Sequence, residues 1–127
     1  MIQEEHVSFE TAKLLKIKKF DFPCMHVYQD NGNFISLHTL CGWRYACNSE
    51  LVAEYSAPTQ AVAMRYLREV HNLFIELKVS KNTFLWGYRV SNPNGSTSCL
   101  HASTFNTFEE ACEAAIKYYL ENLIKNV

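Results

Sequence analysis

Two histidines and one cysteine between residues 26 and 41 carry side chains that bind metal ions. If the apolar residues on either side of Gly32 face the core of a hairpin, strand alternation places His26 and His38 together on its outer face. A three-residue loop would make them cross-strand partners, and Cys41 follows three residues after His38. Zinc needs three or four ligands at about 2.0–2.3 Å, and no fourth ligand is evident. These three residues are therefore weak metal candidates, and the sequence predicts no bound metal and no other cofactor.

A cysteine can also act as a nucleophile if a base lies beside it and a third group orients that base. Cys41 precedes a glycine and is the cysteine best suited to an exposed turn. Cys24 and Cys99 lie in predicted strands and Cys112 on the apolar face of a predicted helix, where a thiol behaves as a core residue. No glycine-rich phosphate-binding motif is present. The sequence therefore predicts a protein without enzymatic activity.

The strongest basic patch is a set of lysines on the first predicted helix. Lys13, Lys16 and Lys19 form a stripe, and Lys18 lies beside it. Basic patches contact nucleic-acid phosphates, but lysines late in a helix also complement its dipole. With 12 Lys and Arg against 13 Asp and Glu, the formal charge of −1 gives no general attraction to nucleic acid. These four lysines are therefore weak nucleic-acid candidates.

Residues 57–124 are predicted to share the α-β-β-β-α order of double-stranded-RNA-binding domains. Those domains contact phosphates through a basic start of their second helix. This chain has Glu109 and Glu110 at that position, which would repel phosphates. Nucleic-acid binding is therefore an alternative that the sequence does not favour.

The elements that must position these residues begin with a predicted helix at residues 8–19, for which Ser8 is the expected N-cap. Asn31-Gly32-Asn33 between two apolar segments predicts a β-hairpin. The predicted strands of this half are residues 25–28, 34–39 and, with weaker alternation, 43–46 and 51–55.

Residues 55–72 predict a central helix with a clear start and stop. Pro58 suits its first turn, and Asn72 suits a left-handed residue after its end. Arg65 and Glu69 are spaced i,i+4 on the solvated side. An apolar stripe about 100° wide is expected to face the core and consists of Ala63, Tyr66, Leu67 and Val70.

The C-terminal part alternates like a half-buried sheet and ends in a helix. Strands are predicted at 73–79, 84–90 and 97–103, with a turn at 92–95 and with Phe84 on the same face as the later aromatic residues of its strand. Thr107 and Glu110 form a capping box for a helix that continues to about residue 124.

We expect these elements to form a single α+β domain over residues 1–127. Its antiparallel sheet would carry helices mainly on one face, in the order α-β-β-(β)-α-β-β-β-α. No apolar segment approaches the roughly 20 residues that span a bilayer, and the N-terminal segment lacks the apolar core of a secretory signal. Five cysteines without a C-x-x-C spacing are typical of reduced thiols. We therefore expect a cytoplasmic location and no membrane partner.

The last predicted helix has an apolar arc of roughly 200°, about twice the width that contact with a sheet requires. The arc therefore needs a second contact. That contact is either another helix of the same chain or a second copy of the protein, with Ala114 and Tyr118 at the interface of a homodimer.

Five segments carry a family resemblance, namely SFETAKLLK (8–16), FDFPC (20–24), YSAPTQ (55–60), LREVHN (67–72) and TFEEA (107–111). Together they resemble a family of small proteins of Bacteroides-type gut bacteria and their phages or mobile elements. Tyr66 stands where that family is expected to have tryptophan. The family has no assigned activity, so the resemblance implies a one-domain intracellular protein and transfers no functional residue.

The leading prediction is a non-enzymatic protein-interaction or regulatory domain of a bacterial or phage/mobile-element protein. Its partner would be another protein or a second copy of the chain. The alternative is a nucleic-acid-binding accessory protein that acts through the first-helix lysines Lys13, Lys16, Lys18 and Lys19.

Overall fold

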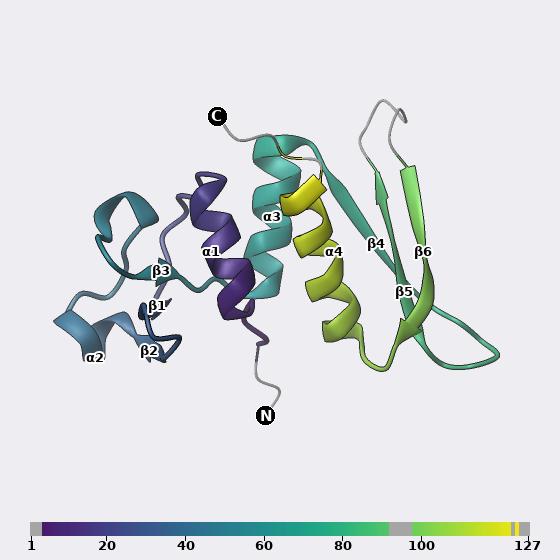
Figure 1. The fold of residues 1–127 in the computed structure, drawn as a ribbon, viewed down its shortest axis with the longest axis horizontal. Helices are drawn as coiled ribbons and strands as arrows, with labels where there is room; N and C mark the ends of the chain where they lie inside the picture. The colour runs from purple at the N-terminus through teal and green to yellow at the C-terminus, as the bar shows by residue number, and fades with distance from the viewer. Residues whose placement is uncertain (1–3, 92–97, 123, 125–127) are drawn as a thin grey trace. The chain divides into compact units, whose positions relative to one another are not determined.

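A computed structural model describes residues 4–91, 98–122 and 124 of the chain (Figure 1). Within these residues, four α-helices, one short 3-10 helix and six strands alternate along the sequence. The strands form two three-stranded antiparallel sheets, so the α+β class is confirmed, while the expected sheet is divided in two. The chain separates into two compact units, with the boundary at residues 62 and 63. Each unit is described by itself.

The N-terminal unit begins with helix α1, Phe9–Ile17. Ser8 is its N-cap, as predicted, because its hydroxyl accepts a hydrogen bond from the Thr11 N–H at 3.2 Å. The chain leaves the helix through Lys19, whose φ of 68° is left-handed. This reversal lets the Phe20 N–H reach the Leu15 carbonyl at 2.9 Å and buries the Phe20 ring completely.

The first sheet consists of β1 (His26–Tyr28), β2 (Phe34–Ser36) and β3 (Tyr55–Ser56), in the order β2-β1-β3. The predicted hairpin joins β1 to β2, and Gly32 supplies the positive φ of 89° in its loop. Val27 at the centre of β1 is fully buried and belongs to a core cluster with Leu37 and Ala46.

The chain after β2 differs from the prediction. Residues 37–39 do not continue the strand; helix α2, Leu37–Cys41, starts there because the Ser36 hydroxyl caps it by accepting from the Thr39 N–H at 3.2 Å. The expected strand at 43–46 is reduced to one isolated bridge between Ala46 and Cys24. The 3-10 helix η1, Asn48–Glu50, follows, and the expected strand at 51–55 begins only at its last residue.

Helix α3, Gln60–His71, starts two residues after Pro58, which therefore lies before the first turn and not in it as predicted. The Thr59 hydroxyl caps the helix by accepting from the Val62 N–H at 3.2 Å. Asn72 adopts the predicted left-handed conformation, with φ 58°. The Arg65 guanidinium and the Glu69 carboxylate form the i,i+4 ion pair at 2.8 Å. Ala63, Tyr66 and Leu67 are buried as expected, but Val70 is 54% exposed and lies outside the core.

The second sheet belongs to the C-terminal unit and has the order β4-β5-β6. Its strands are β4 (Phe74–Val79), β5 (Trp86–Ser91) and β6 (Ser98–Phe105). Helix α4, Phe108–Asn122, packs on one face and contacts all three strands (Figure 1). Tyr88 and Val90 of β5 are buried beneath it. One-sided cover by a helix is the arrangement that the alternation predicted.

The turn between β4 and β5 differs from the prediction. Phe84 is not on the face of β5 but in the β4–β5 turn, where it has φ 58° and is 75% exposed. The predicted turn at 92–95 lies outside the described residues.

The Thr107 cap of α4 is confirmed, because its hydroxyl accepts from the Glu110 N–H at 3.1 Å. The Glu110 carboxylate accepts from the Asn106 N–H at 3.3 Å, one residue earlier than a capping box requires.

Of the helices in the described part of the chain, none is both long enough and apolar enough to cross a lipid bilayer.

Candidate functional site

A groove of about 370 Å³ opens on the N-terminal unit, within the range of roughly 300–1,000 Å³ that is usual for binding pockets. Met25 and Tyr45, about half exposed, offer apolar contact area. The remaining lining residues are Glu4, His6, Pro23, Cys24, His26, Ala57, Pro58, Thr59, Ala61 and Val62. The wall is thus mainly apolar, with two imidazoles, the hydroxyls of Thr59 and Tyr45, one thiol and one carboxylate.

The N-terminal segment forms one wall of this groove because it pairs with the chain just before α3. The Val7 N–H donates to the Pro58 carbonyl at 3.0 Å, and the Gln60 N–H donates to the Glu5 carbonyl at 2.8 Å. His6 lies opposite Thr59 in the resulting isolated bridge. The Tyr28 hydroxyl donates to the Val7 carbonyl at 2.6 Å and ties the same segment to β1.

Three aromatic rings meet beside the groove. The His6 and His26 ring centroids are 5.0 Å apart, and each is also 5.0 Å from the ring of Phe34. His26 stacks nearly parallel on Phe34, at an interplanar angle of 8°, while His6 meets both rings edge-on. Phe34 is still 46% exposed, so this shelf offers aromatic area to a bound molecule.

The surroundings shift the pKa of two groups in the groove. Burial lowers the pKa of His6 from its usual 6.5, and the neighbouring His26 lowers it further, against partial compensation from Glu4 and Glu5. Burial raises the pKa of the Cys24 thiol to about 12. At neutral pH Cys24 is therefore a protonated wall residue and not a thiolate.

The free energy of unfolding should fall as the pH is lowered through about 6.5. Unfolded His6 takes up a proton near its usual pKa of 6.5, whereas folded His6 does so only at lower pH, so the unfolded state binds more protons in this window. His71, whose pKa is also lowered by burial, contributes with the same sign. Denaturation midpoints across this pH range measure the effect. An identical pH dependence in wild type and His6→Gln would contradict the His6 contribution.

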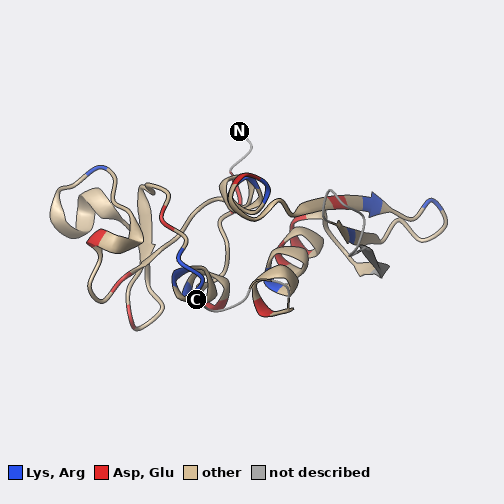
Figure 2. Cartoon of the chain, turned by 90° about the horizontal axis from the view of Figure 1, so that it is seen from above, with Lys and Arg blue, Asp and Glu red and all other residues tan. Residues whose placement is uncertain are grey.

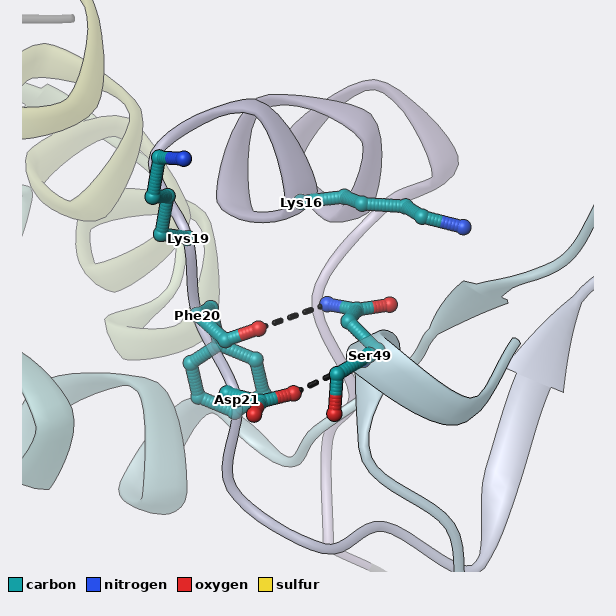
Figure 3. A pocket seen from close by; sticks show the side chains of 6 residues that line it. Lys16, Lys19, Phe20, Asp21 and Ser49 are labelled. Carbon is teal, nitrogen blue, oxygen red and sulfur yellow. Dashed lines mark hydrogen bonds between the residues drawn. The ribbon is translucent and has the colours of Figure 1, made fainter. Parts of the chain in front are cut away.

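A second, smaller hollow of about 290 Å³ lies beside the end of α1 (Figure 3). Two lysines, Lys16 and Lys19, line it from α1 and the turn that follows. The other lining residues are Phe20, Asp21, Asn48 and Ser49. Figure 3 shows that the two lysine side chains diverge, and that the Asp21 carboxylate, which accepts from the Ser49 N–H at 2.8 Å, lies below them. The hollow therefore presents mixed charge.

Lys16 and Lys13, two of the candidate lysines, make internal contacts. The Lys16 ammonium donates to the carbonyls of Leu51 and Glu54, at 3.3 and 2.7 Å, and thereby holds the loop before β3 against α1. The Lys13 ammonium lies 4.5 Å from the centroid of the Phe9 ring. Lys18 is half-buried and Lys19 exposed. The basic colour on α1 in Figure 2 thus includes lysines whose ammonium groups already contact other parts of the chain.

The three metal candidates are not brought together as predicted. His26 lies opposite Ser36, not His38, because the chain turns into α2 after β2. His38 and Cys41 are exposed residues of that helix. In the part of the chain that the structure describes, no three or more His, Cys, Asp and Glu side chains are grouped so as to hold a metal ion.

The candidate dimer residues lie on α4. Ala114 and Tyr118 are both half-buried. The Tyr118 ring lies 6.4 Å from the Tyr88 ring of β5, so part of the wide apolar arc is covered by the sheet of the same chain. Cys112 is fully buried on α4 and its thiol donates to the Met64 sulfur at 3.6 Å.

His6, Met25 and Tyr45 are the groove residues that the sequence did not single out. His6 is positioned by the pairing of residues 5–7 with 58–60, and Met25 and Tyr45 are neighbours of the isolated bridge between Cys24 and Ala46. No local pattern in the sequence predicts either pairing, because both join segments more than twenty positions apart. The presence of a histidine, His6, near the N-terminus was the one available sign of a polar group in this region.

Comparison with known proteins adds no further site residue. No family model, curated protein or solved structure matches this chain. The candidate functional residues are therefore those that the geometry of the groove provides.

Proposed function

We propose that this chain is a non-enzymatic protein-interaction domain, and that the groove of the N-terminal unit binds an apolar segment of a partner protein. The observation that carries the proposal is the composition of the groove wall. Met25 and Tyr45 stand about half exposed beside prolines and the aromatic shelf of His6, His26 and Phe34. Both residue types are enriched at protein interfaces: the flexible methionine side chain adapts its shape to a partner, and the tyrosine ring offers a rigid contact area.

Cysteine chemistry receives less support than binding. Burial raises the pKa of both Cys24 and Cys112 to about 12, and the pKa of Cys47 is also raised. A raised pKa lowers the thiolate fraction that a nucleophile needs. Cys24, Cys41, Cys47 and Cys112 are free thiols, which supports the proposal that the protein acts in the reducing cytoplasm, as part of a bacterial or phage/mobile-element system.

Nucleic-acid binding through Lys13, Lys16, Lys18 and Lys19 remains the alternative, with less support. The contacts of Lys16 with two carbonyls would have to break before its ammonium could contact a phosphate. Asp21 in the adjoining hollow adds a repulsive charge.

Selection of peptides from a random displayed library tests the proposal. The selected peptides should be rich in apolar residues and should bind wild type, but binding should be lost on Met25→Glu, which places a charge in the groove. Val52→Glu is the matched control, because Val52 is 96% exposed in the same unit and does not line the groove. Peptides that bind Met25→Glu as tightly as wild type, or a library without any binder, would remove the proposal.

A further inference from the structure

The outer edge of β4 offers backbone hydrogen-bonding groups for another strand. β4 is the first strand in the sheet order β4-β5-β6 and pairs with β5 over all six residues, from Phe74 opposite Ser91 to Val79 opposite Trp86. Among the residues that the structure describes, no strand or isolated bridge pairs with its other side.

The turn after β4 fixes which residues face that edge. The Ser80 N–H donates to the Leu85 carbonyl, and the Ser80 carbonyl accepts from the Phe84 N–H, both at 2.8 Å, so Ser80 directs its backbone groups toward β5. Backbone direction alternates along an antiparallel strand. Ile75, Leu77 and Val79 therefore direct one N–H and one carbonyl each to the outer edge.

β4 lacks most of the features that usually prevent edge pairing. It contains no proline or glycine, and its register with β5 shows no bulge. Lys78 is a charge of the kind that protects edges, but Glu76 on the same face accompanies it. The Lys78 ammonium and Glu76 carboxylate are 3.6 Å apart, with side chains 47% and 57% exposed.

We propose that β4 pairs antiparallel with β4 of a second copy, with Leu77 opposite Leu77 on a two-fold axis. Ile75 then lies opposite Val79, so the three outward donors of each copy meet the three outward acceptors of the other. Glu76 lies opposite Lys78 twice, once on each side of the axis. The β4-β5-β6 sheet of one copy and that of the second copy then form one continuous sheet.

Charge complementarity selects this register. A slip by two residues along β4 places either Glu76 opposite Glu76 or Lys78 opposite Lys78, and like charges directly opposite one another are destabilising. A slip by one residue pairs outward backbone groups with groups that are already bonded to β5. The register centred on Leu77 is the one that matches both the backbone and the charges.

Charge-reversal variants in light scattering test the pairing. The mass of wild type should rise with concentration from 14.7 kDa toward twice that value. Lys78→Glu places glutamate opposite glutamate twice and should keep the protein monomeric, as should Glu76→Lys by lysine repulsion. The double variant with both exchanges restores opposite charges and should dimerise again. Within its own sheet Glu76 lies opposite Arg89, whereas Lys78 lies opposite Gly87. The Lys78→Glu variant should therefore disturb folding less than Glu76→Lys.

Three results would each overturn the pairing. These are a wild-type mass constant at 14.7 kDa, a Lys78→Glu variant that dimerises like wild type, and a double variant that is folded by circular dichroism but stays monomeric. Met25→Glu lies on the other unit and should leave the dimer intact, so this test and that of the peptide groove have independent outcomes.

Discussion

Replacing Asn48 with alanine should destabilise the N-terminal unit by about 3 kcal/mol, the largest single effect that we expect. Asn48 is only 6% exposed, and both the nitrogen and the oxygen of its side-chain amide form hydrogen bonds. Its Nδ2 donates to the Phe20 carbonyl and its Oδ1 accepts from the Ser56 N–H, both at 2.9 Å. Alanine removes two hydrogen bonds and leaves two buried backbone groups without these partners, which costs more than the bonds themselves.

The midpoint of chemical denaturation measures this loss, and Ser49→Ala is its control. Ser49 is adjacent, but it is exposed and binds the Asp21 carboxylate through its backbone N–H, which alanine retains. The control should therefore stay within about 0.5 kcal/mol of wild type. Equal midpoints for the two variants would show that Asn48 does not connect the segment after α1 to β3 in solution.

Tyr119→Phe should destabilise the C-terminal unit by about 2 kcal/mol. Tyr119 on α4 is fully buried, and its hydroxyl lies 2.6 Å from the Phe74 carbonyl and 2.8 Å from the Ser91 carbonyl. Those two residues are opposite one another in β4 and β5, so one hydroxyl joins the helix to both strands. Burial also raises the pKa of Tyr119 to about 12, so the hydroxyl keeps its donor proton at neutral pH.

The same chemical change at an exposed position provides the control. Tyr45→Phe removes a hydroxyl from a residue that is 51% exposed and should leave the unfolding midpoint within about 0.5 kcal/mol of wild type. If Tyr119→Phe is no more destabilising than Tyr45→Phe, the hydroxyl of Tyr119 is not a structural connection between α4 and the sheet.

Local signals in the sequence predicted much of the secondary structure. The Ser8 and Thr107 caps are confirmed because a hydroxyl needs only the N–H three residues later. Asn72 has the predicted left-handed φ, and Gly32 lies in the loop of the predicted hairpin, since turn geometry also depends on adjacent residues. The alternation of residues 73–79 and the length of α4 were predicted for the same reason, and with them the α+β class.

Short segments whose local signals favoured two different structures could not be predicted in this way. His38 lies in α2 and not in a strand because the Ser36 hydroxyl accepts a hydrogen bond from the Thr39 N–H. In this conformation Leu37 packs in the core. Phe84 left the face of β5 because the turn from Ser80 needed a left-handed residue at its position. Each local pattern was compatible with two structures, and the sequence alone did not choose between them.

The sequence by itself determined the Ser8 and Thr107 caps, the three longer helices and the alternating strand β4, because these depend on residues within one or two turns of each other. Only the tertiary structure decided that the strands form two sheets, that the Lys16 ammonium binds the loop before β3, and that His6 reaches His26. The groove and the outer edge of β4 belong to this second group. Both result from contacts between segments distant in sequence, whose formation depends on the free energy of the whole packed unit and not on any local pattern.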